Sequence, residues 1–562
     1  MVASFYPDRA VIARLLIFIV LILATASCSP SRKQNANPVS SALSELKKGF
    51  RDPPNEARLR VFWWWLNGMA TPESITRDLE EMKAKGFGGA LIFDAGSSNY
   101  SVAKKTTAGP VFLSEGWMQL LEHAVREADR LGLELSMNIT SGWNPGGPHI
   151  TPADALKKLT WKEIRVTGPA SFDEILPMPD TLLWYQDITV QAFPAAPEGK
   201  ALSQILNWDI KSLNRALGWK GIYPLYKLRE VGSDPALTLD PDKIIRLDKH
   251  TSNGRLRWNV PAGEWIIVRY GYTCTGARVS TASDGWDGLS FDHLSPEAFR
   301  KHFNAVALPI IGRAQKAGKS LKYLATDSWE MGVANWTRDF PGEFRKYRGY
   351  DLMKYMPVLT NRVVGSRELS DRFLKDFRQT VGDCVADNCY VLFRDLSAEY
   401  GLMIHPEAGG PHSAPVDGLR VLGIGEMPMG EFWARSNTHR VAEAERLCVK
   451  QSASAAHIYG KRYVAAEGPT SIGPQWERSP RDQKNVLDRI FCAGVNRIFW
   501  HTYTSSPDEF GEPGNEYFAG THLNRHATWW SQAGSFTGYI NRCSWLLSRG
   551  LFRADVLWYY GD

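Results

Sequence analysis

The sequence has few cysteines, and none of them are paired at a metal-binding spacing. Seven Cys occur in 562 residues, and the six that follow Cys28 are scattered, without a CxxC pair. A structural zinc site therefore has no ligand pattern in this chain. Scattered cysteines of this kind are more typical of buried free thiols than of a disulfide framework.

Charge of one sign is not in excess either. Lys and Arg number 66 and Asp and Glu number 60, and they are mixed without a basic stripe, so nucleic acid is not expected as a partner. No glycine-rich phosphate loop follows the first strand-like run, and no EF-hand loop or Ser-His-Asp arrangement is present. The missing phosphate loop weighs against a doubly wound open sheet.

The N-terminal apolar run is short. Arg9 and Arg14 precede LLIFIVLILATAS (15–27) and Cys28. Such a run is too short for a comfortable membrane span and is typical of an export signal. Because ATASC resembles a bacterial lipoprotein processing site, we expect a periplasmic or outer-membrane lipoprotein with signal peptide 1–28, a lipid anchor on Cys28 and a flexible tether at 29–52. Simple secretion with Cys28 removed is the alternative.

Apolar runs alternate with helical patterns through most of the remaining chain. The runs cover residues 61–68, 89–94, 133–140, 321–330, 402–410, 420–432, 462–469 and 496–505. Continuous apolar strands separated by helices indicate a parallel sheet with both faces covered. Eight such units predict an α/β fold of the (β/α)8 barrel type. A doubly wound open sheet is the alternative.

The alternation is interrupted after the third strand. Short alternating runs between 159 and 274 predict a β-rich insertion. We therefore expect a first barrel part at 53–158, the insertion at 159–280 and the rest of the barrel at 281–550. Residues 551–562 look like the first strand of a following domain that is cut short, so C-terminal accessory domains are expected to be missing.

Polar residues gather at the carboxyl ends of the apolar runs, where a (β/α)8 barrel carries its active site. They are Asn67, Asp94, Asn138, Asp327, Glu330, Glu407, Glu426, Glu431, Glu467 and His501. One such residue would be an ordinary loop start. A series across eight strands, several of them carboxylates, favours a single site at this edge.

Carboxylates near tryptophan fit glycoside hydrolysis, which needs a protonated carboxyl group as acid and an ionised one as base or nucleophile. Glu330 follows Trp329, and an apolar neighbour raises the pKa of an acid by desolvation. Glu467 precedes a glycine at a strand end and is the expected partner. Surplus carboxylates also suit Ca²⁺, although Arg and Lys neighbours could balance their charge instead.

With these residues in hand, the sequence resembles glycoside hydrolase family 106, the bacterial α-L-rhamnosidases. The resemblance rests on PPNEARLRVFWWWLNG, ITRDLEEMKAKGFGGALIFD, SGWNPGGPHITP, DHLSPEAF, ATDSWE, HPEAGGP, GEMPMGEFW, AAEG and GTHLNRHATWW. It implies a (β/α)8 catalytic domain that removes terminal α-L-rhamnose from plant polysaccharides with inversion, assisted by Ca²⁺ at the sugar hydroxyls.

The resemblance also implies roles for individual residues. Glu330 matches the general acid and Glu467 the general base, and the calcium ligands are expected to be Asp327, Glu407 and Glu431. Sugar contacts are assigned to Trp329, Glu426, His501, Asn138 and Trp143. For His501 a core role is an equal alternative, and His405 is expected to be structural. A glycosidase for another sugar, such as a β-galactoside, and a non-catalytic glycan-binding surface lipoprotein remain as alternative functions.

Overall fold

The computed structural model describes residues 38–97, 107–215, 234–410, 414–435 and 443–558. The chain forms two compact units, residues 1–52 and 53–562. Where the first unit is described it is helical, as α2 (Pro38–Arg51), whereas the sequence predicted a flexible tether there. The expected signal peptide and Cys28 lie outside the described residues. Of the helices that are described, none is long and apolar enough to cross a membrane.

The second unit is built on an eight-stranded parallel sheet. Four of its eight strands are buried along their whole length, which explains their continuous apolar sequences. In chain order the strands are β1 (Arg60–Leu66), β2 (Gly89–Ala95), β3 (Glu134–Ser141), β11 (Leu321–Thr326), β12 (Met403–Pro406), β13 (Met429–Arg435), β14 (Ala465–Ser471) and β15 (Arg497–Thr504).

The spatial order of the strands is β12-β11-β3-β2-β1-β15-β14-β13. This is the chain order closed between the last strand and the first, and interrupted between the fifth and the sixth. Within the described residues no ladder joins the edge strands β12 and β13. A backbone hydrogen bond of 2.8 Å, from Glu426 N to Ile404 O, links the residues before β13 to β12. The predicted α/β class is confirmed.

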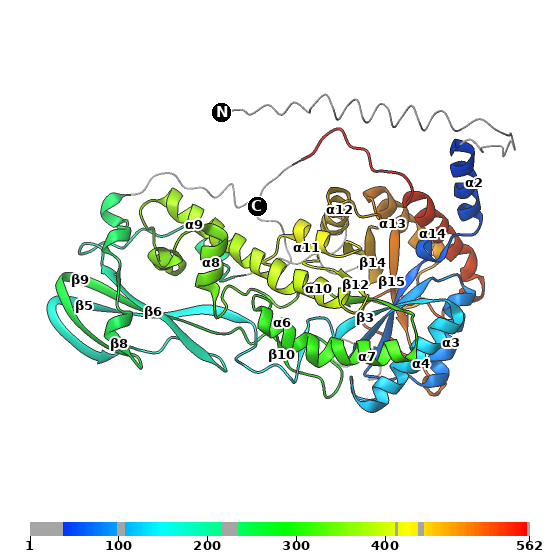
Figure 1. Ribbon diagram of the computed structural model, residues 1–562, viewed down its shortest axis with the longest axis horizontal. Helices are drawn as coiled ribbons and strands as arrows, with labels where there is room; N and C mark the ends of the chain where they lie inside the picture. Colours follow the sequence, from blue (N-terminus) through cyan, green and yellow to red (C-terminus); the bar gives the residue numbers. More distant parts are fainter. Residues whose placement is uncertain (1–37, 98–106, 216–233, 411–413, 436–442, 559–562) are drawn as a thin grey trace, which may run out of the picture. The chain divides into compact units, whose positions relative to one another are not determined.

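Helices follow most of the strands and lie outside the sheet (Figure 1). α3 contacts α4, α4 contacts α7, and α11 to α14 contact one another in sequence. The α-helices of this unit are α3 (Pro72–Ala84), α4 (Glu115–Leu131), α5 (Trp208–Lys211), α6 (Pro296–His302), α7 (Leu308–Ala317), α8 (Phe340–Arg348), α9 (Arg367–Cys384), α10 (Leu392–Ala398), α11 (Gly418–Ile424), α12 (Glu443–Ile458), α13 (Pro480–Ala493) and α14 (Ala533–Leu547). The π-helical segments η6 (Phe303–Ala307) and η8 (Val385–Val391) join α6 to α7 and α9 to α10.

Local sequence explains where several helices begin and end. α3 starts with a capping box in which Ser74 N donates to Thr71 Oγ1 and Thr71 N donates to Ser74 Oγ. Ser114 caps α4, and Gly132 ends it with a positive φ of 65°, a conformation that glycine adopts without steric cost.

A second sheet separates β3 from β11 in the chain (Figure 1). It is antiparallel, in the order β5-β9-β6-β7, with β8 also pairing to β9. Residues of this sheet and of the segments next to it form a small apolar cluster of their own. The strands are β5 (Lys157–Ile175), β6 (Tyr185–Pro194), β7 (Ile245–Arg246), β8 (Thr251–Ser252) and β9 (Arg255–Cys274); β4 (Gly146–Gly147) and β10 (Leu289–Ser290) form a separate short pair.

Two segments differ from the sequence prediction. Residues 420–432 were expected to form one strand, but α11 ends at Ile424 and β13 begins only at Met429. The Asp417 side chain accepts a hydrogen bond from Arg420 N and so caps a helix over residues that are also apolar enough for a strand. Residues 553–558 are exposed and contain no strand, so the predicted strand is wrong for the described part of that segment.

Candidate active site

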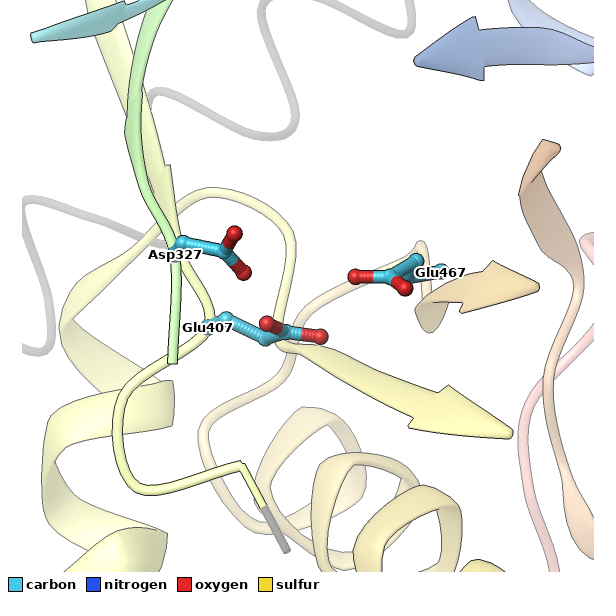
Figure 2. A group of neighbouring side chains, drawn as sticks. All are labelled: Asp327, Glu407 and Glu467. Atoms are coloured by element: carbon cyan, nitrogen blue, oxygen red, sulfur yellow. The ribbon is translucent and has the colours of Figure 1, made fainter. Parts of the chain in front are cut away.

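Three carboxylates from β14 and from the carboxyl ends of the neighbouring strands β11 and β12 lie close together. Asp327 follows β11, Glu407 follows β12, and Glu467 lies in β14. Each offers an oxygen, and these oxygens all lie within 4.8 Å of one another. Figure 2 shows the three side chains pointing toward a common centre. The sequence prediction that acids from distant segments share one site is consistent with this geometry.

Strand register explains how Asp327 and Glu407 come together. Thr326 of β11 pairs with Pro406 of β12, so the next residues of the two strands are Asp327 and Glu407. Glu407 N donates to Thr326 O at 3.0 Å and continues the ladder by one bond. On the other side of the site, Glu431 of β13 pairs with Glu467 of β14.

The cluster is electrostatically unfavourable when all three groups are ionised. Burial raises the pKa of Asp327 to about 8, and the charges of Glu467 and Glu330 add to this rise. Burial, followed by the charges of Glu467, Asp327 and Glu431, raises the pKa of Glu407 well above its usual range. Protons or a bound cation must therefore offset the charge of this cluster.

The donor set fits a hard cation. Both oxygens of Glu407 are buried, and among the described residues neither has an N–H or hydroxyl donor; the neighbouring Asp327 carboxyl is the one group that hydrogen-bonds there, when one of the two acids is protonated. A buried carboxylate without donors is uncommon, and an oxygen-binding ion such as Ca²⁺ would satisfy it. The geometry groups Glu467 with Asp327 and Glu407. From the sequence, Glu431 was predicted as the third calcium ligand instead. Its Oε1 accepts a hydrogen bond of 2.8 Å from Trp433 Nε1.

Glu467 is oriented by two neighbours. Its Oε1 lies 3.1 Å from His501 Nδ1, and Thr470 Oγ1 donates to the same oxygen at 3.0 Å. Thr470 Oγ1 also lies 2.9 Å from His501 Nδ1. All three side chains are buried, so the position of this carboxylate is fixed by packing as well as by hydrogen bonds.

Glu330 lies beside the same cluster. It belongs to the segment that follows β11, is partly exposed, and its Oε1 lies 3.5 Å from Ser328 Oγ. Its charge contributes to the raised pKa of Asp327, as the charge of Glu467 does. The two predicted catalytic carboxylates therefore both lie near Asp327, although they are 137 positions apart in the sequence.

This arrangement of acids at a sheet edge agrees with the comparisons to known proteins. The α-L-rhamnosidase family, glycoside hydrolase family 106, matches residues 51–204 and 184–562. The chain belongs to this family. The resemblance stated from the sequence motifs is therefore confirmed.

Two relatives show how far the similarity extends. A curated protein of Formosa agariphila, named "Putative beta-glucuronidase", is 37% identical over 525 residues, covering 92% of this chain and 43% of that protein. The structure of a rhamnosidase from Novosphingobium sp. PP1Y superposes with a TM-score of 0.77 at 26% identity, covering 90% of this chain and 61% of that chain. This glycoside hydrolase family 106 chain thus spans less than two thirds of either relative.

Three of the sugar-contact residues predicted for this family 106 chain, Asn138, Trp143 and His501, differ in burial and in the groups they contact. Asn138 is buried, and its amide donates to Thr140 O and Gly142 O. Trp143 is partly buried, with its ring centroid 5.8 Å from that of Phe518. His501 contacts Glu467, as described above.

The two remaining predicted sugar contacts, Trp329 and Glu426, have side-chain partners outside the carboxylate cluster. Trp329 is buried in the main core, where its indole N–H donates to Gly332 O. Glu426 is exposed, pairs with Lys461 at 3.7 Å and precedes β13 at the amino end of the strand. This correction follows from the strand boundary: β13 begins at Met429, so Glu426 belongs to the edge opposite the carboxylates.

Sequence reasoning missed Thr470 and Tyr517. Thr470 lies three residues after Glu467, so its contact could have been expected from the polar end of β14. Tyr517 comes from the segment after β15, and burial, together with the charges of Asp327 and Glu330 among other neighbours, raises its pKa. No local pattern places this tyrosine near residues almost 200 positions earlier.

Proposed function

We propose that this chain is the catalytic part of an α-L-rhamnosidase that removes terminal α-L-rhamnose from plant-type polysaccharides. The observation that carries the proposal is the meeting of Asp327, Glu407 and Glu467 at one edge of the sheet, with Glu330 beside them. Family membership supports the same reaction class. Carbohydrate is the expected partner of such a site.

In the proposed mechanism two carboxyl groups act on opposite faces of the sugar. Glu330 gives its proton to the departing glycosidic oxygen, and ionised Glu467 takes a proton from the attacking water. The bond from C1 to the leaving oxygen breaks as the water oxygen bonds to C1, which inverts the configuration. Thr470 and His501 both contact Oε1 of Glu467, which leaves Oε2 for the water.

Calcium has a defined place in this proposal. Asp327 and Glu407 would hold the ion, which would supply positive charge against the acids and an oxygen-binding centre for the sugar hydroxyls. The buried oxygens of Glu407, which have no N–H or hydroxyl donor among the described residues, are the support for this assignment.

We propose that the eight strands form a closed (β/α)8 barrel that is interrupted after the third strand. The cyclic strand order and the hydrogen bond from Glu426 N to Ile404 O support closure. Closure would gather all eight carboxyl ends around one site, as in other barrels of this type.

A β-glucuronide is the second candidate substrate, because the Formosa agariphila relative is named for that activity. A glucuronide carries its own carboxylate, and like charges at close range are unfavourable. Any negative charge that Asp327, Glu407 and Glu467 keep after protonation or cation binding therefore disfavours a glucuronide and favours a neutral sugar. Rhamnose is neutral, with a methyl group at the position of the glucuronate carboxylate.

A panel of p-nitrophenyl glycosides tests this choice. We expect hydrolysis of the α-L-rhamnoside with kcat/KM at least about 100-fold above that of the β-D-glucuronide and the β-D-galactoside, a difference of about 2.7 kcal/mol. Preference for either β-glycoside would contradict the rhamnosidase proposal. Binding of rhamnosides without turnover in excess Ca²⁺ would instead support a glycan-binding protein.

We also infer that the protein is exported and anchored in a bacterial membrane through a lipid on Cys28. The support is the order of charged, apolar and small residues before that cysteine. In the bacterial host, wild-type protein is expected in the membrane fraction with an acylated N-terminus by mass spectrometry, and Cys28→Ser in the soluble fraction. A wild-type protein whose mature chain begins after Cys28 would contradict the anchor.

A further inference from the structure

The segment after β15, residues 505–526, returns across the strand ends that carry Glu467 and His501. Thr521 N donates to His501 O, and Thr502 N donates to Thr521 O. Gly520 N donates to Ser471 O at the end of β14. These backbone bonds fix residues around 520 on the carboxyl ends of β14 and β15, next to the candidate site.

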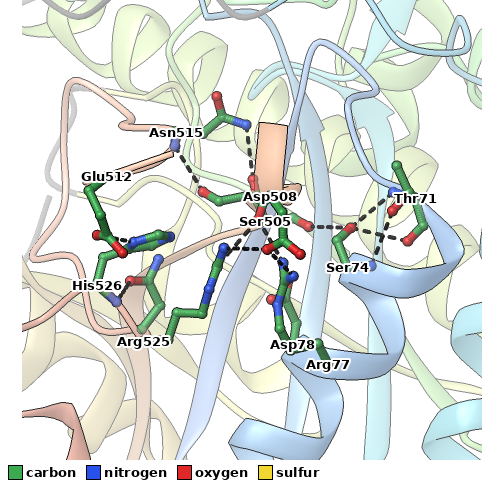
Figure 3. A network of polar contacts seen from close by, with 12 residues as sticks. Thr71, Ser74, Arg77, Asp78, Ser505, Asp508, Glu512, Asn515, Arg525 and His526 are labelled. Carbon is green, nitrogen blue, oxygen red and sulfur yellow. Dashed lines mark hydrogen bonds and ion pairs between the residues drawn. The ribbon is translucent and has the colours of Figure 1, made fainter. Parts of the chain in front are cut away.

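The same segment is anchored to α3 by a polar network (Figure 3). Arg77 of α3 donates to Ser506 O and pairs with Asp508, and Arg525 pairs with the same aspartate at 3.0 Å. Asn515 closes the segment on itself through Ser506 Oγ and Ser505 O. Such cross-links at both ends of the segment restrict the positions available to the residues between them.

Tyr517 is the residue that this segment places against the site. Its ring stacks on Trp64 with centroids 4.3 Å apart and planes at 23°, and it lies edge-on to His501 at 6.2 Å. The Tyr517 side chain is buried. Burial, together with the charges of Asp327 and Glu330, raises the pKa of its hydroxyl, so the hydroxyl lies within electrostatic range of both acids.

Three polar atoms on these neighbouring rings have no hydrogen-bond partner among the described residues. They are Trp64 Nε1, His501 Nε2 and Tyr517 Oη. Thr281 and Trp143 come near the tyrosine hydroxyl without completing a hydrogen bond. Buried donors and acceptors are nearly always satisfied in folded proteins. Three unsatisfied groups on one aromatic wall, beside Glu467, indicate a place where polar groups of a ligand are bound.

We propose that Tyr517, stacked on Trp64 and beside His501, forms the wall that binds the sugar ring, with Tyr517 Oη hydrogen-bonded to a sugar oxygen. The inference rests on the proposed glycosidase function and adds residues that bind the substrate. An aromatic wall with polar atoms suits a sugar, which presents apolar C–H faces and hydroxyl groups together. The anchored segment 505–526 then sets the orientation of the substrate relative to Glu330 and Glu467.

Tyr517→Phe tests the inference, because it removes the hydroxyl and keeps the ring. We expect kcat/KM on p-nitrophenyl α-L-rhamnoside to fall about 10- to 100-fold, the range for one lost hydrogen bond in a site. Tyr270→Phe is the matched control. Tyr270 also has a buried hydroxyl without a partner, but it lies in β9 of the second sheet. Its variant should retain wild-type kcat/KM.

A direct binding measurement separates substrate contact from a structural effect. Titration calorimetry with L-rhamnose should show weaker binding to Tyr517→Phe than to Tyr270→Phe, while the two variants unfold at temperatures close to that of the wild type. Wild-type kcat/KM and wild-type rhamnose affinity in Tyr517→Phe would overturn the inference.

Different results would contradict the sugar wall at Tyr517 and the rhamnosidase function. If Glu467→Gln abolishes rhamnoside hydrolysis while Tyr517→Phe is unaffected, the sugar wall is wrong and the rhamnosidase stands. If the wild type hydrolyses no rhamnoside but binds L-rhamnose through Tyr517, the sugar wall stands and the enzyme assignment is wrong.

Discussion

Glu467→Gln is expected to lower kcat on an α-L-rhamnoside by about 10²- to 10⁴-fold, the contribution of a positioned general base. The amide keeps the shape of the side chain, and its oxygen can still accept from Thr470. The protein should therefore fold normally, and only proton removal from water is lost. Steady-state kinetics with circular dichroism as a folding check measures this effect.

Glu330→Gln should show a different dependence on the leaving group. A missing general acid matters less when the departing oxygen is already a stable anion. Dinitrophenyl rhamnoside should therefore be cleaved by Glu330→Gln far better than an alkyl rhamnoside, whereas Glu467→Gln should be slow on both. Glu426→Gln is the control, since this exposed residue lies at the opposite strand end and should leave activity unchanged. Full activity in either catalytic variant would remove that residue from the mechanism.

Removal of calcium is expected to abolish activity and to lower the unfolding temperature of the protein. Binding stabilises a folded protein by about 2.7 kcal/mol when the ligand is at 100 times its Kd. Differential scanning calorimetry with EDTA and with added Ca²⁺ measures the difference. If the chelator leaves the activity unchanged, the metal has no role in catalysis.

The Glu407→Gln variant tests whether the calcium ion binds at the cluster of Asp327, Glu407 and Glu467. Burial and the neighbouring carboxylates raise the pKa of Glu407 well above its usual range, so a neutral side chain is already favoured there without metal. The unfolding temperature in EDTA should therefore change little, while the Ca²⁺-dependent increase is lost. Glu467→Gln then separates two roles: retained Ca²⁺ binding marks Glu467 as a base only, and lost binding marks it as a ligand too.

The regular part of the fold could be predicted from sequence because local patterns specify it. The apolar run before Asp327 and the capped start of α3 at Thr71 are examples in which propensity, burial and capping agree. The single strand predicted at 420–432 was wrong because a short apolar segment is compatible with a helix or a strand. Here the Asp417 cap decided for a helix in its first half.

The candidate site could be predicted only in part. Asp327 and Glu467 follow from the rule that parallel strands end at one edge, so acids at those ends come together. Glu426 was misplaced because its position depends on where β13 begins. Tyr517 could not be found, since its place depends on hydrogen bonds from residues 505–526 to strands and a helix far away in the sequence.

A crystal structure with Ca²⁺ and L-rhamnose would show whether one site holds the ion, the sugar and both catalytic acids. We expect the anomalous signal of the ion within about 2.3–2.6 Å of oxygens of Glu407 and Asp327, the usual range for Ca²⁺. The sugar should lie against Tyr517, between Glu330 and Glu467. An ion held by other residues, or a sugar bound away from these carboxylates, would contradict the account.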